Sequence, residues 1–353
     1  MSTTETSPSD PDAAPGAPRA GRLLLIDGHS MAFRAYYALP VDSFTTSTGQ
    51  ATNAVHGFIS MLLSLLEQER PTHLAVAFDL PGGTFRTRQY PGYKANRDET
   101  PRPFIGQIEL IEDILAAMGV RAVTAPDYEA DDVLATLAAR ARAEGLEVLV
   151  CSGDRDSFQL ITENCTVLQP VRGGSAPRRM TPAQVQERYG VSPERYPHLA
   201  ALVGETSDNL RGVPGVGPKT AAKWLNLYDG LDGVIAHAGQ IRGRAGASLR
   251  EHLDDVVRNR RLNRLVTDVD LGIDPLRDLR PGGAGREELA RIMEALELRS
   301  LHRRAQRVLA FRDDAGSGDG SGDPVRERLA ALEIAVLGRQ VEPGGVGAWL
   351  DRH

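Results

Sequence analysis

The sequence predicts an α/β protein in which a mostly parallel sheet, flanked by helices, is followed by a helical domain. From Arg22 to about residue 178, short apolar runs suited to buried strands alternate with segments of helical periodicity. Such alternation favours right-handed crossovers and a parallel sheet. From Thr181 onward the pattern is helical. Acidic residues follow several predicted strands directly, at the edge where open parallel sheets bind ligands.

The composition is typical of a globular protein that is large enough for two domains. The 353 residues are 41% hydrophobic and 25% charged, which is ordinary for a soluble fold with a core. No apolar run approaches the roughly 18 residues needed to cross a bilayer, and the N-terminus lacks the basic start and apolar region of a signal peptide. We therefore expect a cytoplasmic protein without membrane contact, and we also expect a monomer.

The chain has two cysteines, Cys151 and Cys165, both in or near predicted strands. There is no C-x-x-C motif and no histidine spacing typical of a zinc site. We therefore expect two reduced, buried thiols that act as small hydrophobic side chains.

The elements of the first domain follow in order along the chain. Residues 1–21 contain almost no large apolar side chain and are expected to be disordered. Apolar runs predict strands at residues 23–26, 73–78, 121–124, 146–151 and 165–168. Apolar side chains at helical spacing predict helices at residues 54–66, 105–118 and 131–143. Together these elements predict a domain that spans residues 22–178.

A basic and aromatic segment, at about residues 80–104, separates the second strand from the next helix. It is too long for an idle connection, and we expect it to be mobile and to face the substrate. Arg86, Lys94 and Arg97 are candidates for holding the oxygens of a scissile phosphate. Tyr93 is a candidate for stacking on an unpaired base. The alternative is a solvated charged loop.

The second domain is predicted to be helical and to span residues 179–312. The pair Thr181-Pro182 suits the N-cap and first turn of its first helix. Residues 313–324 are rich in glycine, serine and aspartate, as in a flexible linker. The C-terminal tail, residues 325–353, contains one short amphipathic stretch that could form a helix.

A glycine-rich turn within the second domain leads into a predicted helix at residues 220–227. It is not a P-loop, because Pro218 separates Gly217 from Lys219. The free amides and positive end of the helix suit a phosphate, which is the signature of a helix-hairpin-helix that reads DNA backbone. The predicted DNA contacts here are Gly212, Val213, Gly215, Val216, Gly217, Lys219, Thr220 and Lys223. The alternative is a merely structural helical hairpin.

Nine carboxylates in five clusters stand at strand ends and helix starts, where their side chains could meet. They are Asp27, Asp79, Glu129, Asp131, Asp132, Asp154, Asp156, Glu205 and Asp208. A single Asp after a strand is usually an N-cap, but one helix needs only one cap. Carboxylates gathered at one edge repel one another unless cations neutralise them. The sequence therefore predicts two divalent ions, Mg²⁺ or alternatively Mn²⁺, with many contacts through water.

Such a metal site favours phosphodiester hydrolysis. Two ions about 4 Å apart can generate hydroxide on one side and stabilise the departing oxygen on the other. Without these nine carboxylates the formal net charge would change from −6 to +3, so the charge does not exclude a polyanionic substrate. His29 follows Asp27 directly, but a role behind the ligands is favoured over that of general base.

Six motifs in this chain together resemble a known family. They are Asp-Gly-His-Ser at 27–30, Phe-Arg through Tyr-Lys-Ala-Asn-Arg at 85–97, Tyr-Glu-Ala-Asp-Asp at 128–132, Gly-Asp-Arg-Asp at 153–156, Ser-Asp-Asn at 207–209 and Gly-Val-Pro-Gly-Val-Gly at 212–217. In this order, over residues 22–310, they resemble the 5′-3′ exonuclease domain of bacterial DNA polymerase I and its stand-alone relatives in the flap endonuclease superfamily.

The resemblance implies a PIN-like (resolvase-like) catalytic domain with a helical arch, then a helix-three-turn-helix (SAM-like) domain that binds duplex DNA. It implies that the clustered acids are metal ligands, and that Lys94 and Arg97 contact phosphate at the base of the arch. Three positions depart from the family pattern: Glu205 stands where aspartate is common, Arg155 where lysine is frequent and Arg211 where proline is frequent. No polymerase sequence follows in this chain, which favours a stand-alone nuclease.

The expected activity is metal-dependent 5′-3′ exonuclease cleavage of double-stranded DNA, with structure-specific cleavage of 5′-flapped DNA and 5′-phosphorylated products implied by the family. One alternative is a PIN-type ribonuclease, which would share the acidic sheet edge but would not need a duplex-binding helical domain. Another is a DNA-binding scaffold without catalysis. That alternative is disfavoured because none of the expected acidic positions has become neutral.

Overall fold

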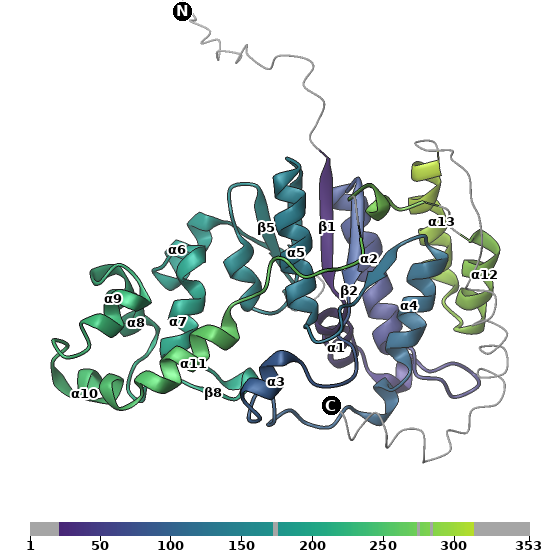
Figure 1. Ribbon diagram of the computed structural model, residues 1–353. Helices are drawn as coiled ribbons and strands as arrows, with labels where there is room; N and C mark the ends of the chain where they lie inside the picture. The colour runs from purple at the N-terminus through teal and green to yellow at the C-terminus, as the bar shows by residue number, and fades with distance from the viewer. Residues whose placement is uncertain (1–20, 172–175, 274–275, 283–284, 314–353) are drawn as a thin grey trace, which may run out of the picture.

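The computed structural model describes residues 21–171, 176–273, 276–282 and 285–313 (Figure 1). The expected disordered N-terminal tail, the glycine-rich linker and the C-terminal tail lie outside the described residues, apart from Gly21 and Asp313. No helix in the described ranges is long and apolar enough to cross a bilayer.

The centre of the fold is a six-stranded sheet with the strand order β3-β2-β1-β4-β5-β6. Its strands are β1 (Arg22–Asp27), β2 (His73–Ala77), β3 (Arg121–Val123), β4 (Glu147–Cys151), β5 (Cys165–Gln169) and β6 (Arg178–Met180). The first five are parallel and confirm the predicted strands, whereas β6 pairs antiparallel with β5 at one edge. The sequence did not indicate β6, because it has only three residues and two of them are exposed arginines.

The sheet is buried on both faces. Along β1, Leu23 and Leu25 pack on the side of α5 (Ala130–Ala143), whereas Leu24 and Ile26 pack on the side of α2 (Asn53–Glu69). This alternation follows from the two-residue period of a strand and explains its continuous apolar run. The other helices on the α2 side are α1 (Gly28–Ala38), α4 (Gln107–Ala117), α12 (Arg286–Ala295) and α13 (Arg299–Asp313).

Helices beyond β6 form a second lobe on the side of the sheet away from α12 and α13 (Figure 1). They are α6 (Pro182–Tyr189), α7 (Tyr196–Val203), α8 (Pro218–Leu227), α9 (Leu231–Ala236), α10 (Gly243–Glu251) and α11 (Leu253–Asn263). A two-stranded hairpin, β7 (Gly204–Glu205) and β8 (Leu210–Arg211), joins α7 to the glycine-rich turn. The predicted start of α6 is confirmed, since Thr181 and Gln184 form a capping box.

The chain returns from this lobe to the first domain, which the predicted division at residue 179 did not anticipate. The segment after α11 crosses α5, where the Arg140 guanidinium donates hydrogen bonds to the carbonyls of Val269 (3.0 Å) and Ile273 (2.8 Å). Helix α13 then packs on α2, and Arg304 forms an ion pair with Glu67 at 2.6 Å. Residues 286–313 therefore belong, by packing, to the first domain.

The core is also continuous between the lobes. One cluster of buried apolar side chains includes Val133 on α5, Phe158, Leu199 on α7 and Leu225 on α8. A shared core of this kind holds the second lobe against the sheet, because separating the two would expose apolar surface to water. Short 3₁₀ helices complete the described chain: η1 (Val41–Ser43), η2 (Arg102–Phe104), η3 (Asp156–Leu160), η4 (Pro193–Arg195), η5 (Thr206–Asp208) and η6 (Leu276–Leu279).

Both cysteines are free and buried in the sheet, as expected. Burial raises the pKa of the Cys151 thiol and that of the Cys165 thiol to about 12. A thiol with such a pKa is protonated at neutral pH and is a poor nucleophile. Both side chains therefore serve as packing groups.

Candidate metal centre and nucleic-acid interface

Three acids meet at the carboxyl edge of the sheet because β1, β2 and β4 are adjacent and parallel. Asp27 is the last residue of β1, Asp79 lies two residues after β2, and Asp154 lies three residues after β4. Asp27 also caps α1, accepting a hydrogen bond from the Ser30 amide at 3.0 Å. Asp79 accepts one from the Ala130 amide at 2.7 Å, at the start of α5. Asp27 and Asp79 therefore each accept a hydrogen bond from an amide at the start of a helix and also contribute a carboxylate to the site.

A second group of acids closes the site from the side of the helical lobe. The carboxylates of Asp156, Glu205 and Asp208 offer ligand atoms that all lie within 4.8 Å of one another. Asp156 begins η3, while Glu205 and Asp208 come from the β7–η5 segment. Glu205 thus reaches the site as the sequence predicted.

The two groups form one electrostatic unit. Burial first, and then the neighbouring charges of Asp79 and Asp154, raise the pKa of Asp27 to about 7 against the opposing hydrogen bonds from Ser30 and Ser152. Burial and the charge of Asp154 also raise the pKa of Glu205 to about 7. For Asp131, burial and then the charges of Asp27 and Asp154 place the pKa well above its usual value.

Several carboxylate oxygens at this site are buried without a hydrogen-bond partner. In the described part of the chain, Asp131 Oδ1, Asp156 Oδ1 and Glu205 Oε2 accept no hydrogen bond. A buried charged oxygen without a partner is costly, and a divalent cation would satisfy it. The ligand atoms are carboxylate oxygens, which suits Mg²⁺ or Mn²⁺. The residues present therefore fit a metal centre.

Lys94 and Arg97 border the acids, as does Arg86, which lies 3.4 Å from Glu129 Oε2. The Lys94 ammonium lies 2.9 Å from Glu129 Oε1, and its backbone, at φ 57°, donates a hydrogen bond to the carbonyl of Asp208. Burial disfavours the charged ammonium, but the charges of Glu129 and Asp208 outweigh this and raise the pKa of Lys94. The Arg97 guanidinium lies 3.1 Å from Asp208 Oδ1 and is half exposed. Two of the three predicted phosphate contacts, Lys94 and Arg97, therefore reach the site.

Tyr93 is placed differently from the expectation. Tyr93 is only 4% exposed, and its hydroxyl lies 3.1 Å from both Glu129 Oε2 and Asp208 Oδ2, to one of which it donates. A ring buried in this way offers no free face to a base. The geometry therefore does not support stacking, and the Tyr93 hydroxyl instead lies between two carboxylates and donates to one of them.

Arg86 and Asp132 are also placed differently from the expectation. Arg86 is 1% exposed, and its guanidinium donates two hydrogen bonds to Asp132, at 2.6 and 2.8 Å. It also donates to the carbonyls of Leu262, in the last turn of α11, and Arg264, just after this helix. Asp132 is fully buried and accepts from the Val266 amide as well. The geometry therefore supports neither a phosphate contact for Arg86 nor metal ligation by Asp132, and the pair instead joins the two lobes.

The segment at residues 80–104 contains one short α-helix, α3 (Phe85–Gln89), followed by turns and by the 3₁₀ helix η2. The expected helical arch is not present as a long helix in the described chain. The segment is held against the site by Arg86 and Tyr93, and by Asn96, whose amide donates to the carbonyl of Thr206 at 2.9 Å. These contacts contrast with the mobility that its length suggested.

Two further residues support the carboxylates. His29 accepts a hydrogen bond from the Asp79 amide at Nδ1 (3.1 Å) and packs edge-on against Phe78, behind the acids. Ser152 donates to Asp27 Oδ2 at 2.8 Å and accepts from the Asp154 amide. The sequence pattern did not assign Ser152 a role, although its position between β4 and Asp154 was a usable signal.

The glycine-rich turn is built to leave backbone exposed. Val213 and Val216 are buried and anchor the turn, and the Val213 amide donates to the carbonyl of Leu202 at 2.8 Å. Gly215 has φ 79°, and a Cβ atom there or at Gly217 would meet nothing within 4 Å. This open space lies at the start of α8, where amides of the first turn have no acceptor within the helix.

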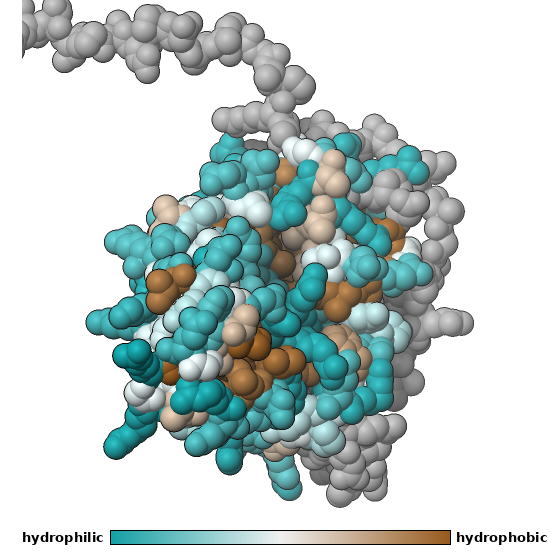
Figure 2. Space-filling view, turned by 60° about the vertical axis from the view of Figure 1, so that its left-hand side comes forward, coloured by the Kyte–Doolittle hydropathy of each residue, from teal (hydrophilic) through white to brown (hydrophobic). Residues whose placement is uncertain are grey.

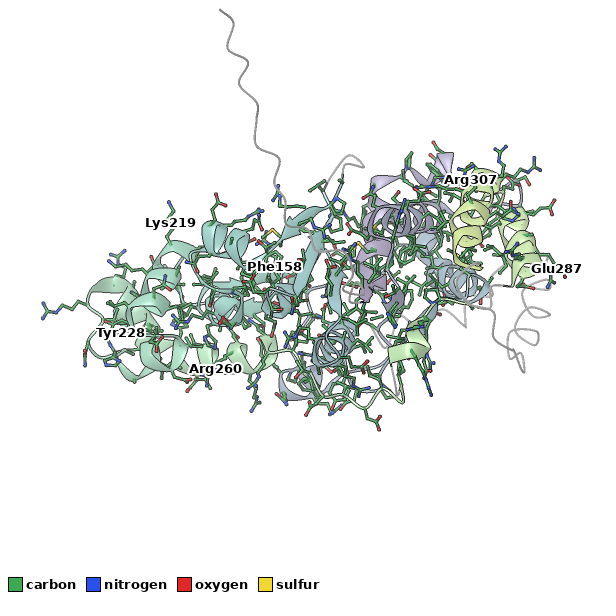
Figure 3. The ribbon with its side chains drawn as sticks, turned by 90° about the horizontal axis from the view of Figure 1, so that it is seen from above. Phe158, Lys219, Tyr228, Arg260, Glu287 and Arg307 are labelled. Carbon is green, nitrogen blue, oxygen red and sulfur yellow. The ribbon has the colours of Figure 1, made fainter. Side chains whose placement is uncertain are left out.

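Positive charge surrounds this helix start. Lys219 and Lys223 on α8 are both exposed, and Figure 3 shows Lys219 at the rim of the helical lobe. Free amides, a positive helix end and two exposed ammonium groups together suit the phosphates of a nucleic acid. The structure thus brings these predicted contacts together, with Val213 and Val216 contributing backbone only.

Two family models match the chain. One, described as the N-terminal resolvase-like domain of 5′-3′ exonuclease, matches residues 22–190. The other, described as the C-terminal SAM fold of 5′-3′ exonuclease, matches residues 191–287. The two matches are consecutive and end near the start of α12.

Curated proteins similar to this chain include DNA polymerase I of Mycobacterium tuberculosis, which is 45% identical over 353 residues, or 100% of this chain and 37% of that protein. DNA polymerase I of Mycobacterium leprae is 46% identical over 331 residues, or 94% of this chain and 35% of that protein. The chain therefore spans little more than a third of the length of these relatives.

Solved structures with a similar fold include the bacteriophage T5 D15 flap endonuclease, in a complex with DNA and metal ions. It has a TM-score of 0.57 and 19% identity, with 82% of this chain and 98% of that chain covered. The catalytic core of Rad2, in complex with DNA substrate, has a TM-score of 0.53 and 16% identity, with 83% and 92% covered. At such identities the likeness is one of fold.

Proposed function

Because this chain belongs to the 5′-3′ exonuclease family, we propose that it is a metal-dependent 5′-3′ exonuclease acting on double-stranded DNA. It hydrolyses phosphodiester bonds near a 5′ end and also cleaves 5′-flapped DNA. The main support is the convergence of acids from distant parts of the chain, with buried oxygens of Asp131, Asp156 and Glu205 left without hydrogen bonds. The protein acts as a monomer.

Two Mg²⁺ ions fit the proposal, with Mn²⁺ as the alternative. Asp156, Glu205 and Asp208 would hold one ion, and the acids on the Asp27 side of the site would hold the other. These acids are Asp27, Asp79, Glu129, Asp131 and Asp154. When bound, such ions supply a Lewis acid and a water of lowered pKa. Tyr93 and Ser152 keep the carboxylates in place by hydrogen bonds.

Lys94 and Arg97 contact the scissile phosphate in this proposal. Their present partners, Glu129 and Asp208, are proposed metal ligands, so metal binding would compete for those carboxylates. The ammonium and guanidinium would then be available to neutralise charge on the phosphate oxygens. The duplex lies on the glycine-rich turn with Lys219 and Lys223, which hold its backbone regardless of sequence.

The proposal is tested with 5′-end-labelled duplex and 5′-flapped DNA, incubated with Mg²⁺ or with EDTA. We expect cleavage near the 5′ end only with the metal, and loss of cleavage in Asp154→Ala. The matched control is Glu163→Gln, an exposed acid just before β5, at the opposite edge of the sheet. Cleavage in EDTA would contradict the proposal, preference for equal amounts of RNA would favour the ribonuclease, and binding without turnover would favour a scaffold.

A further inference from the structure

The helical lobe carries a second basic surface, distinct from the glycine-rich turn. It is a groove of about 910 Å³ along α11, named here the α11 groove, and its lining includes Gln159, His198, Arg258, Arg260, Arg261 and Arg264. Figure 3 shows Arg260 and Lys219 on opposite sides of this lobe. The groove therefore lies on the face opposite the proposed duplex contacts.

The α11 groove begins beside the metal centre. Asp156 starts η3, and Gln159 of the same 3₁₀ helix lines the groove. The Gln159 amide donates to the carbonyls of Asp156 (3.0 Å) and Asn263 (2.9 Å), and its oxygen accepts from the Leu265 amide. The groove wall at the end of α11 is thus bonded directly to the backbone of a proposed metal ligand.

Charge changes along the groove. Asp232 and Asp254 line it toward α9 and the start of α11, and Glu194 lines it as well. Arg260 is paired with Asp232, and Arg258 with Asp255 at 2.7 Å. Arg261 and Arg264, at the other end of α11, are exposed and take part in no ion pair among the described residues. The uncompensated positive charge therefore lies at the end next to η3.

The surroundings favour a polar ligand. His198 Nδ1 and Arg258 Nε are buried without a hydrogen-bond partner in the described part of the chain. Figure 2, which brings this lobe forward, shows a mainly hydrophilic surface with small hydrophobic patches. Arginine guanidinium groups without carboxylate partners suit phosphate, which they bind through paired N–H groups.

We propose that Arg261 and Arg264, at the η3 end of the α11 groove, bind phosphates of the single-stranded 5′ segment beyond the scissile bond. The inference rests on the proposed function. With the duplex on the face of Lys219 and the metal centre at the sheet edge, a strand that passes the centre leads to the opposite face. There the groove holds its backbone without reading its sequence.

The test compares Arg261→Gln/Arg264→Gln with Arg303→Gln/Arg307→Gln, which removes two exposed arginines from α13. Arg307 lies at the far end of the molecule from the helical lobe (Figure 3). Binding is measured by fluorescence anisotropy in Ca²⁺, after checking that the DNA stays intact, with the same duplex carrying a 20-nucleotide or a 1-nucleotide 5′ flap.

We expect the groove variant to bind the long flap about threefold to tenfold more weakly than the unmodified protein. The slope of log affinity against log salt concentration should also become shallower by about 1.4, which is about 0.7 for each of the two single-strand phosphates no longer contacted. Binding of the short flap, and all binding by the α13 variant, should change little. Arg261→Lys/Arg264→Lys should retain most of the long-flap affinity, and thermal unfolding checks that each variant is folded.

An equal loss on both flaps would assign the groove to duplex, and no loss on either would exclude DNA as its ligand, leaving an acidic protein segment as the candidate. Either result overturns the inference. The binding readout needs no turnover, so failure of the proposed function is recognised separately, as absence of cleavage by the unmodified protein in Mg²⁺ and Mn²⁺.

Discussion

Asp131 and Asp132 are neighbours in sequence, but they belong to regions with opposite electrostatics. Asp131 lies in the acidic cluster, and one of its buried oxygens has no hydrogen-bond partner among the described residues. Asp132 is fully buried one residue later, and its carboxylate is satisfied by Arg86 and by the Val266 amide. In the acidic cluster the carboxylates repel one another, and a bound cation would reduce this repulsion. The Asp132 carboxylate, in contrast, is already neutralised by Arg86. A ligand site therefore differs from a structural ion pair in that some of its buried charged oxygens have no hydrogen-bond partner.

The largest expected effect comes from a variant that breaks the ion pair between Arg86 and Asp132. Arg86→Met should lower the free energy of unfolding by about 3–5 kcal/mol, because it leaves the Asp132 charge buried without a partner. Urea unfolding followed by circular dichroism measures this.

The matched control is Arg88→Met on the same short helix. Arg88 pairs with Asp127 at 2.5 Å, but its side chain is 62% exposed, so the loss of unfolding free energy should be much smaller than that of Arg86→Met. Equal losses in the two variants would show that the Arg86 pair has no special structural role.

The second prediction concerns a variant that removes one carboxylate from the acidic cluster. Asp156→Asn should lower the rate of cleavage of 5′-labelled DNA in Mg²⁺ by at least about 100-fold, more than the loss of a group behind a metal ligand. The same variant in EDTA should unfold at an equal or higher temperature than the unmodified protein, because it removes one of several crowded charges. A marked fall in metal-free stability would mean that Asp156 is a structural residue instead.

The smallest expected effect is a dependence of metal-free stability on pH, which arises from the acidic cluster. The pKa of Asp27 is raised from 3.8, and that of Glu205 from 4.5, to about 7 in the folded protein. The folded state therefore holds more protons than the unfolded state between about pH 4 and pH 7, so metal-free stability should fall as pH rises through this window. Thermal unfolding in EDTA from pH 4.5 to 8 measures the fall.

Adding Mg²⁺ should therefore raise the unfolding temperature more at pH 8 than at pH 5, since metal and protons compete for the same carboxylates. Metal-free stability that increases with pH from 4.5 to 7 would contradict the proposed cluster.

Much of the site could be predicted because adjacent parallel strands end at the same edge of the sheet, where the acids that follow them meet. Asp27, Asp79 and Asp154 each follow an apolar run, and parallel strands bring such positions to one edge. Residue chemistry alone could not assign the roles of Arg86 and Tyr93. Both stand in a basic, glycine- and proline-punctuated segment that suggests a solvated loop, yet the fold buries both.

The sequence by itself determined the five parallel strands, the acidic edge and the glycine-rich turn, because periodicity and turn chemistry act over a few residues. Only the tertiary structure decided that Asp132 faces Arg86 and that residues 286–313 return to the first domain. It also decided that Arg261 and Arg264, the unpaired arginines at the end of α11, lie beside η3. These outcomes depend on contacts between residues far apart in the chain, which spacing and periodicity do not encode.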